Sequence, residues 1–166
     1  DQFPVAGLFI GRQGVFARVE LDGRGATARG RLDLLTVRIN EQGHLGTPFR
    51  HQGREPGLGL DCIGVIVIAA RAAGFHPRDR RDYGRIPRGT LLETALAAAG
   101  LRPVDPAEAV PGDVLVFTLD RWPRHVALRT GRGMIHAWGE VGRVVEHRLS
   151  PDWADALTAA YRFPGV

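Results

Sequence analysis

A succession of strand-like segments in the last third of the chain constrains the fold more than any other feature of the sequence. After Pro111-Gly112, short runs rich in β-branched and aromatic residues alternate with polar and glycine-containing turns. The segments predicted as strands are residues 113–118, 125–129, 133–138, 142–147 and 158–163. Strands joined by short turns pair side by side, so the sequence predicts an antiparallel sheet of about five strands.

Two helices are predicted ahead of this sheet. Residues 62–73 are rich in β-branched side chains, but a run of this length ending in alanines before Gly74 favours a helix. Residues 90–93 have the spacing of a capping box and predict a second helix, which stops at Gly100. Residues 150–151 (Ser-Pro) predict a short helix before the last strand. Helices followed by an antiparallel sheet indicate an α+β fold.

Composition limits the class of protein without choosing a partner. A chain of 166 residues with 44% hydrophobic content suits one domain with a sizeable core, and no membrane span is predicted. All 22 basic residues are arginines and the net charge is +4, which suits a polyanionic partner or reflects the nucleotide bias of the source genome. Aspartates interrupt the arginines of residues 78–85, so we predict a solvated loop there and no nucleic-acid partner.

Cys62 is the only cysteine of the chain, and it stands at the start of the first predicted helix. The positive end of a helix dipole favours a thiolate, so this position predicts a lowered thiol pKa. With His125 and His136 downstream, the chain holds a nucleophile, a base and a group to orient the base. An inert buried thiol is the structural alternative, and a zinc site at the same three residues is a third hypothesis, although no close ligand pair accompanies them.

The turn between the two histidine-bearing strands predicts that their rings meet. Residues 130–133 (Thr-Gly-Arg-Gly) fit a two-residue hairpin turn with glycine at the first central position, which places Ala127 opposite His136. His125 then lies on the same face as His136, as a diagonal neighbour within reach of a hydrogen bond. Two histidines satisfied separately in the sheet are the alternative. The other histidines lack a partner pattern and are assigned to surface or core: His44, His51, His76 and His147.

Several motifs surround these residues in a fixed order. They are Gly46-Thr47-Pro48-Phe49-Arg50, Asp61-Cys62-Ile63-Gly64, Pro111-Gly112-Asp113-Val114-Leu115-Val116-Phe117, His125-Val126-Ala127-Leu128 and Met134-Ile135-His136-Ala137. Over about residues 45–163 this series resembles the NlpC-type cell-wall cysteine peptidases, a branch of the papain-like superfamily. The resemblance implies a papain-like α+β fold, with a catalytic domain at residues 46–166. It implies neither a metal nor another cofactor.

The family resemblance also implies an activity and a set of site residues. The expected enzyme is a γ-D-glutamyl-diamino-acid endopeptidase or related amidase acting on peptidoglycan stem peptides. Cys62 is expected as nucleophile, His125 as general base and His136 as the orienting third member. Asp61 is expected to contact the free amino group of the substrate. Phe49 and Ile63 are the other expected substrate contacts, and they replace a tyrosine and a serine that are common in the family.

Residues 1–45 have no counterpart in this pattern, and they are interpreted as an N-terminal extension and a possible docking arm. Strand-like alternation at residues 15–22 suggests pairing with another chain, such as a tail or baseplate protein. Residues 51–53 (His-Gln-Gly) and the arginine-rich insertion resemble the variants of phage tails and gene-transfer particles, which implies a virion tail tip acting at the cell wall. A secreted or cell-envelope enzyme is the alternative location. A structural tail or baseplate subunit with weak or no hydrolysis is the alternative function.

Overall fold

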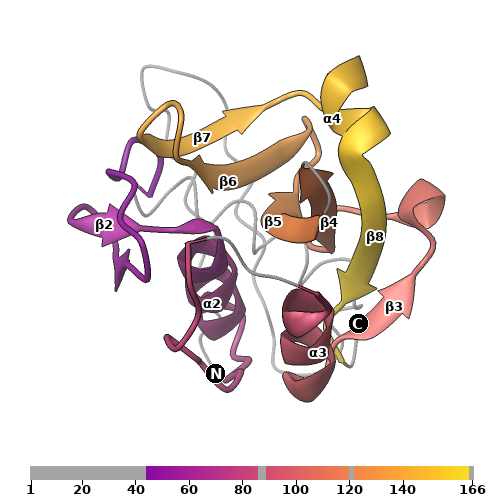
Figure 1. Cartoon of the computed structure of the whole chain (residues 1–166), viewed down its shortest axis with the longest axis horizontal. Helices are drawn as coiled ribbons and strands as arrows, with labels where there is room; N and C mark the ends of the chain where they lie inside the picture. The colour runs from indigo at the N-terminus through magenta and orange to yellow at the C-terminus, as the bar shows by residue number, and fades with distance from the viewer. Residues whose placement is uncertain (1–43, 86–88, 120–121, 165–166) are drawn as a thin grey trace, which may run out of the picture.

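The computed structural model describes residues 44–85, 89–119 and 122–164 of the chain. One curled, six-stranded antiparallel sheet with the order β3-β8-β4-β5-β6-β7 organises these residues (Figure 1). The expected strand at residues 15–22 and the proposed docking arm lie outside the described residues, apart from the last two positions of the arm.

The five strands expected from the sequence are all present. The sheet contains β3 (Arg102–Val104), β4 (Val114–Leu119), β5 (Trp122–Arg129), β6 (Met134–Trp138), β7 (Arg143–His147) and β8 (Leu157–Arg162). The unpredicted strand, β3, lies at the edge of the sheet beside β8, a position where a proline such as Pro103 is tolerated. A three-residue strand built around proline carries no alternation, so the sequence pattern did not indicate it.

Both predicted helices form and end as expected. Helix α2 spans Cys62–Ala72 and α3 spans Leu91–Ala98. Each is followed by a glycine with a positive φ, Gly74 at 83° and Gly100 at 84°, and by the paired backbone hydrogen bonds of a Schellman motif. The fold therefore stops both helices where a residue without Cβ relieves the left-handed conformation. Among the described helices, none has the length and apolar character needed to cross a membrane.

The expected caps of the later helices do not form. Thr90 precedes α3 with φ −99° and ψ 21°, a conformation outside the extended region typical of a cap, and its side chain makes no capping hydrogen bond. Helix α4 (Pro151–Ala156) begins at the predicted proline, but the side chain of Ser150 does not cap it either. The capping-box prediction was therefore wrong in mechanism, although the helix boundaries that it gave were right.

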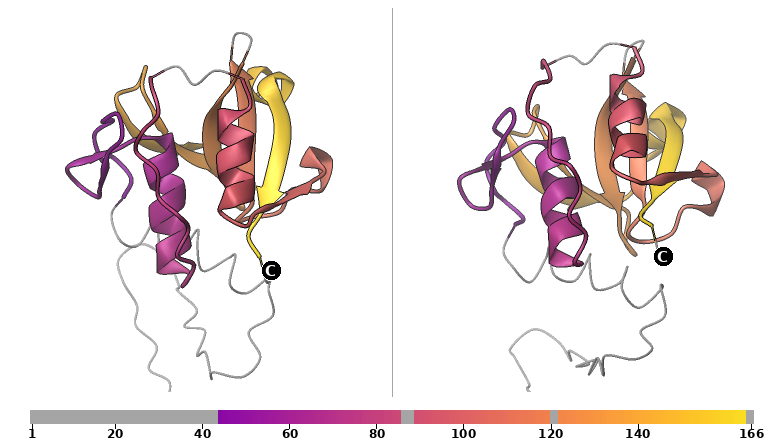
Figure 2. Two further views of the ribbon diagram at one scale, coloured as in Figure 1. Left: turned by 60° about the horizontal axis from the view of Figure 1, so that its bottom comes forward. Right: turned by 90° about the horizontal axis from the view of Figure 1, so that it is seen from below.

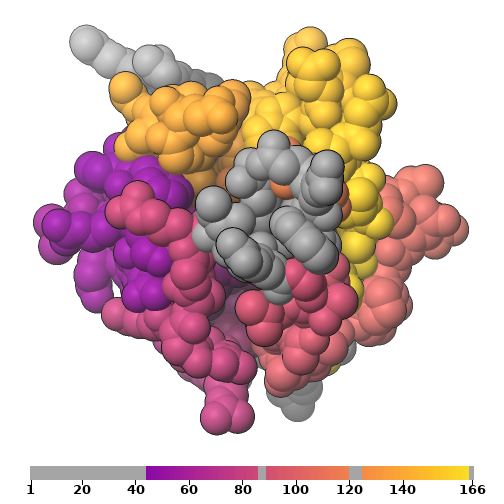
Figure 3. All heavy atoms as spheres, in the orientation of Figure 1, coloured from indigo at the N-terminus to yellow at the C-terminus, as the bar shows by residue number. Residues whose placement is uncertain are grey.

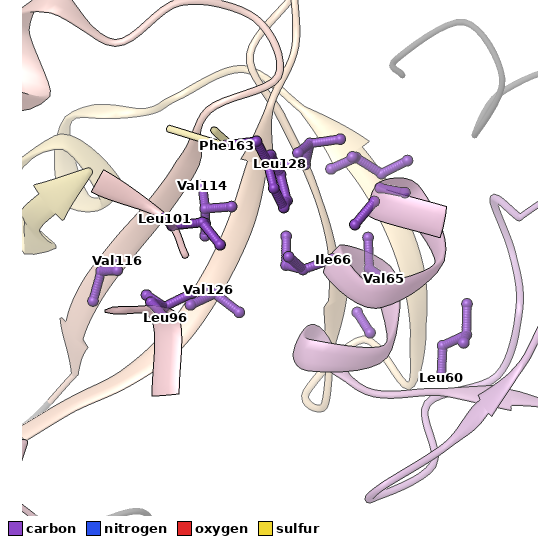
Figure 4. Close-up of a cluster of buried hydrophobic side chains, with 14 of the residues drawn as sticks. Leu60, Val65, Ile66, Leu96, Leu101, Val114, Val116, Val126, Leu128 and Phe163 are labelled. Carbon is purple, nitrogen blue, oxygen red and sulfur yellow. The ribbon is translucent and has the colours of Figure 1, made fainter. Parts of the chain in front are cut away.

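Two apolar clusters cover the two faces of the sheet. Helices α2 and α3 lie side by side on one face (Figure 2), and their buried side chains pack on the strands there (Figure 4). The buried members of this cluster include Leu60, Val65, Ile66, Leu96, Val114, Val116, Val126, Leu128 and Phe163. On the other face, Trp153 of α4 packs with the smaller cluster of Leu115, Phe117, Ala127, Met134 and Ala160.

The segment before α2 is tied to the far edge of the sheet. Backbone hydrogen bonds join Gly46, Thr47 and Phe49 to residues 142–144 at the start of β7. In Figure 3 the indigo segment accordingly lies beside the orange end of the β6–β7 hairpin. In the same segment, Arg54–Glu55 (β1) and Gly59–Leu60 (β2) form a two-stranded ribbon. This ribbon delivers the chain to the start of α2.

The ladder between β5 and β6 is short. Its register contains only the pairs Leu128↔Ile135 and Arg129↔Met134, whereas β6 and β7 pair over five positions. Toward His125, the register of β5 with β6 ends at Leu128, and helix α2 contacts both strands.

Candidate active site

Cys62 is held at the first position of α2 by the residue before it. Asp61 has an extended backbone, and its Oδ1 accepts a hydrogen bond of 2.8 Å from the N–H of Gly64. The backbone N–H of Val126 in β5 lies close enough to the Cys62 thiol to act on its pKa. The expected nucleophile therefore lies against β5, directly beside the position that carries His125.

Desolvation keeps the half-buried Cys62 as a thiol in the free protein. Desolvation, with a further contribution from the Asp61 carboxylate, raises the pKa of Cys62 to about 12. Backbone N–H groups of Val126, Ile63 and Cys62 itself act in the opposite direction and are outweighed. The predicted lowering of the thiol pKa at the helix start was therefore wrong. Attack by Cys62 requires a base that removes its proton.

The carboxylate of Asp61 does more than cap the helix. Asp61 is 3% exposed, and each of its two carboxylate oxygens accepts two hydrogen bonds. Oδ1 accepts from Gly64 N–H and from Nη1 of Arg54, at 3.0 Å. Oδ2 accepts from the Gln52 N–H at 2.8 Å and from the Tyr83 hydroxyl at 2.7 Å. Three separate segments of the chain thus fix the residue next to the nucleophile.

Arg54 provides the positive charge next to the Asp61 carboxylate. Its side chain is 1% exposed and forms ion pairs with Asp61 and Asp79, the latter at 2.9 Å from Nε. Nη2 also donates to the Tyr83 hydroxyl at 2.8 Å. The two remaining N–H groups donate to the carbonyls of Gly53 and Arg80. All five guanidinium donors are therefore used, and residues 79–83 are clamped to the start of α2.

Replacing Arg54 with leucine is expected to lower the free energy of unfolding by about 3–5 kcal/mol, because Asp61 and Asp79 lose the charge that compensates them. Arg80→Leu is the matched control. Arg80 and Asp82 form an ion pair whose side chains are more than 60% exposed, so its loss is expected to change stability little. Urea denaturation of both variants measures the difference. Equal stability of the two variants would show that the buried clamp is not needed for folding.

The predicted meeting of the two histidines is confirmed. His125 in β5 is 9% exposed, His136 in β6 is fully buried, and 2.6 Å separates Nε2 of His125 from Nδ1 of His136. Thr130 N–H donates to the Gly133 carbonyl at 2.9 Å, which continues the register of the β5–β6 ladder into the turn. The register inferred from the turn spacing therefore agrees with the observed one.

The turn at residues 130–133 is stabilised by a different interaction from the one predicted. Gly131 does not adopt a positive φ. Instead, Oγ1 of Thr130 accepts the N–H groups of Arg132 and Gly133, at 3.3 and 3.0 Å. Gly133 is required for another reason, because a Cβ there would collide with the backbone of His147 in β7. A threonine-capped turn and a close strand contact together set the histidine register.

His147 was assigned to surface or core, and this assignment missed its partner. Nε2 of His136 lies 2.8 Å from Nε2 of His147, and Nδ1 of His147 lies 2.7 Å from the carbonyl oxygen of Arg148. The signal was present in the sequence, because His125, His136 and His147 follow one another at intervals of eleven residues (136 − 125 = 147 − 136 = 11). Three adjacent strands thus present a continuous row of imidazoles.

An aromatic wall encloses this row. The Trp153 ring of α4 lies 5.5, 5.0 and 5.9 Å from the rings of His125, His136 and His147. Trp138 stacks on His136 at 5.8 Å with an interplanar angle of 22°. Apolar surroundings of this kind strengthen the hydrogen bonds between the rings and disfavour a charge on the central one.

The stability of the fold is expected to fall in acid because His136 resists protonation. Burial, with repulsion from His125 and His147, lowers the pKa of His136 from 6.5 to about 3. At pH values between these two pKa values, the imidazole of His136 binds a proton in the unfolded chain but not in the folded chain. Below pH 6.5 the free energy of unfolding should therefore fall by about 1.4 kcal/mol per pH unit from this residue alone. His136→Gln should show a shallower acid slope in urea denaturation, and an unchanged slope would contradict this origin.

The two other expected substrate contacts lie near the nucleophile. Ile63 is half-buried and follows Cys62 in the first turn of α2. Phe49 is half-buried, packs on the same apolar cluster, and its ring lies close to Gly139 after β6. These residues surround the start of α2 without a hydroxyl of their own. The hydroxyl nearest to Asp61 comes instead from Tyr83, a residue that the sequence did not single out.

The donor geometry does not favour a metal at this place. Both ring nitrogens of His136 face other imidazoles, so neither points toward the Cys62 sulfur. In the described ranges, no group of three or more His, Cys, Asp or Glu side chains is arranged to hold a metal ion. None of the remaining histidines belongs to this row: His44 is buried, His51 packs edge-on against Tyr83, and His76 is exposed.

The chain matches a known family over most of its described length. The sequence model of the NlpC/P60 family aligns with residues 46–162. An NlpC/P60 family protein from Bacillus cereus superposes with a TM-score of 0.55 at 26% identity, over 77% of this chain and 40% of that protein. The chain thus spans less than half the length of that relative. A search of curated protein sequences found no significant match.

Two further solved structures share the fold at lower identity. The peptidoglycan hydrolase RipB of Mycobacterium tuberculosis gives a TM-score of 0.57 at 22% identity, over 81% of this chain and 65% of RipB. The NlpC/p60 domain of the peptidoglycan hydrolase SagA gives 0.54 at 23% identity, over 77% of this chain and 97% of that domain. These similarities confirm the predicted papain-like α+β fold. With the family match over residues 46–162, they establish that this chain belongs to the NlpC/P60 family.

Proposed function

We propose that the protein is a peptidoglycan hydrolase that cuts stem-peptide amide bonds by cysteine catalysis, as a γ-D-glutamyl-diamino-acid endopeptidase or a related amidase. The observation that carries this proposal is the hydrogen bond between His125 and His136 beside the half-buried thiol of Cys62. RipB and SagA, which are peptidoglycan hydrolases, share the fold, and their activity supports the same substrate class.

In the proposed reaction, His125 removes the proton from the Cys62 thiol as the sulfur attacks the amide carbonyl of the substrate. The tetrahedral intermediate collapses when the protonated His125 gives this proton to the leaving amine, which leaves a thioester on Cys62. Water, deprotonated by the same imidazole, then hydrolyses the thioester and restores the thiol. The backbone N–H groups at the start of α2 are the nearest dipoles for the developing oxyanion.

His136 orients His125 in this proposal and does not exchange a proton with substrate. It is fully buried between two other imidazoles, and its low pKa keeps it neutral throughout the cycle. A neutral ring that accepts the far proton of His125 holds the base in position, as an amide oxygen does in other papain-like enzymes.

Asp61 has a more restricted place in the proposed substrate site. Its two oxygens already accept four hydrogen bonds, and Arg54 balances its charge. Of the four donors, only the Tyr83 hydroxyl comes from a half-buried side chain of the 79–83 loop. A substrate amine would therefore reach Asp61 by replacing this hydroxyl. We propose that Tyr83, Phe49 and Ile63 form the border of this part of the site.

Digestion of purified peptidoglycan followed by mass analysis of the fragments tests the proposal. The endopeptidase activity predicts stem peptides with a new carboxyl group on D-glutamate and a new amine on the diamino acid. Cys62→Ala, which keeps the helix start, is the matched control. Absence of any peptide release by the wild-type protein would contradict the proposed function.

We also propose, from the resemblance to tail-associated variants, that the enzyme acts at a phage-type tail tip during entry, with residues 1–45 docking on tail or baseplate proteins. Action as a secreted or cell-envelope enzyme is the alternative. A structural tail subunit with weak or no hydrolysis is the second candidate function, and intact Cys62, His125 and His136 favour the enzyme over it.

Removing residues 1–30 is expected to weaken binding to tail proteins more than it weakens peptidoglycan hydrolysis, because the described residues already contain the whole proposed catalytic group. Co-purification with tail proteins and hydrolysis rates measure the two effects, and thermal unfolding serves as the control for folding. An unfolded or inactive truncated protein would instead place this segment in the core of the domain.

A further inference from the structure

The row of histidines continues one ring beyond the proposed catalytic group. In the β6–β7 ladder His136 pairs with Val145, and Met134 pairs with His147. His147 is thus two residues away from the direct partner of His136, the same diagonal relation that brings His125 to the other side of His136. Diagonal neighbours on one face are within reach for long side chains, and the distances of 2.6 and 2.8 Å between ring nitrogens confirm the contact.

Hydrogen bonds between imidazoles have no inherent direction, because each ring nitrogen either donates or accepts. The carbonyl of Arg148 supplies the direction, since a carbonyl oxygen only accepts. Nδ1 of His147, 2.7 Å from this oxygen, must therefore carry a proton. In a neutral His147, Nε2 then has no proton and accepts a hydrogen bond from Nε2 of His136.

The direction of the hydrogen bonds is fixed in the same way at the central ring of His136 and then at the base, His125. His136 is fully buried and neutral, so its single proton lies on Nε2 and its Nδ1 accepts. The proton in the hydrogen bond between His125 and His136 must then come from Nε2 of His125. In a neutral His125 this leaves Nδ1 without a proton, as a general base requires.

We infer that His147, anchored on the Arg148 carbonyl, is a positioning residue that sets the tautomer of the base His125 across the intervening ring of His136. The role of His125 as a base rests on the proposed function. The tautomers of the three rings do not depend on any substrate. A carboxylate in the third position of a triad fixes the direction by itself. An imidazole there needs a fourth group, and His147 at the end of β7, with the carbonyl of Arg148 that follows it, provides this group.

Nitrogen-15 NMR of the free protein, labelled at its histidines, tests the inference without any variant or substrate. The shifts of the two ring nitrogens distinguish the tautomers of each residue. We expect the proton on Nε2 in His125 and His136 and on Nδ1 in His147. A doubly protonated His147 would donate from both nitrogens, reverse every bond in the row and place the proton of His125 on Nδ1. Finding that proton on Nδ1 of His125 would overturn the inference.

Two variants of His147 test its consequence for the rate. His147→Leu removes the acceptor, so His136 can reverse and offer a proton to His125. We expect kcat to fall about ten- to a hundredfold with KM unchanged, as when the hydrogen-bond partner of a metal-bound imidazole is lost. In His147→Gln the amide oxygen accepts from His136 while the amide nitrogen donates to the Arg148 carbonyl, so most of the rate should return.

His76→Leu is the control, because it removes an exposed histidine outside the row. A kcat for His147→Leu equal to that of this control would overturn the inference. If His147→Leu does not fold, the rate of His147→Gln and the tautomers of the wild-type protein decide the question. A His147→Gln variant with the expected tautomers and a near wild-type rate supports the inference. Reversed tautomers refute it. If the wild type folds but does not hydrolyse peptidoglycan, the proposed function fails, while the NMR result still decides the inference.

Discussion

Replacing Cys62 with alanine is expected to lower the rate of peptidoglycan hydrolysis by several orders of magnitude, since the sulfur forms the covalent intermediate in the proposed reaction. Removal of the nucleophile of a triad costs about 10⁶-fold in kcat in a well-studied serine protease. Steady-state hydrolysis of peptidoglycan fragments, for both proteins at equal concentration, measures the loss.

The same substitution should leave the fold in place. Alanine favours a helix, and the cap at the start of α2 is made by Asp61 and Gly64 rather than by the thiol. Thermal unfolding of the variant is the control. A folded Cys62→Ala protein that hydrolyses at the wild-type rate would exclude the thiol from the reaction and contradict cysteine catalysis.

Replacing His125 with alanine is expected to cost nearly as much as losing Cys62. The pKa of the thiol is raised to about 12, so at neutral pH only a neighbouring base can produce the thiolate during attack. His125 lies next to Val126, whose backbone N–H is close enough to the sulfur to act on its pKa. His136 faces His125 and His147 and cannot take over the task.

Substitutions of His136 provide the matched comparison. His136→Asn and His136→Gln keep an oxygen that accepts the far proton of His125, so both should retain a measurable fraction of the rate, and His136→Ala should lose more. Single-turnover rates at constant pH separate the three cases. A His125→Ala variant that hydrolyses faster than His136→Ala would show that the roles of the two rings are reversed.

The parts of the fold that local sequence determines were predictable. Helix α2 was recognised against its β-branched composition because Gly74 ends it, and a Schellman motif is present there. The meeting of His125 and His136 followed from the length of a single turn, even though Thr130 rather than Gly131 holds this turn. Short-range rules were sufficient in both cases, since few residues separate cause and effect.

The features that the sequence did not reveal depend on segments distant in the chain. Arg54 and Tyr83 lie 7 and 22 residues from Asp61, and no periodicity connects them. The direction of the Cys62 pKa shift depends on how completely the fold encloses the thiol, which the position at a helix start does not determine. His147 was different, because its eleven-residue interval was visible but gained meaning only when the three strands were known to be adjacent.

The most direct test of the account is alkylation of the single cysteine, because one modified group per chain can then come only from Cys62. The protein is treated with iodoacetamide at mildly alkaline pH, where the raised pKa makes labelling slow but measurable. Intact mass and peptidoglycan hydrolysis are followed in the same samples, with a chelator-treated sample as control. We predict that activity falls in proportion to labelling and vanishes at one group per chain, while the chelator has no effect. Full labelling with hydrolysis preserved, or loss of hydrolysis with the chelator alone, would contradict a thiol-based mechanism.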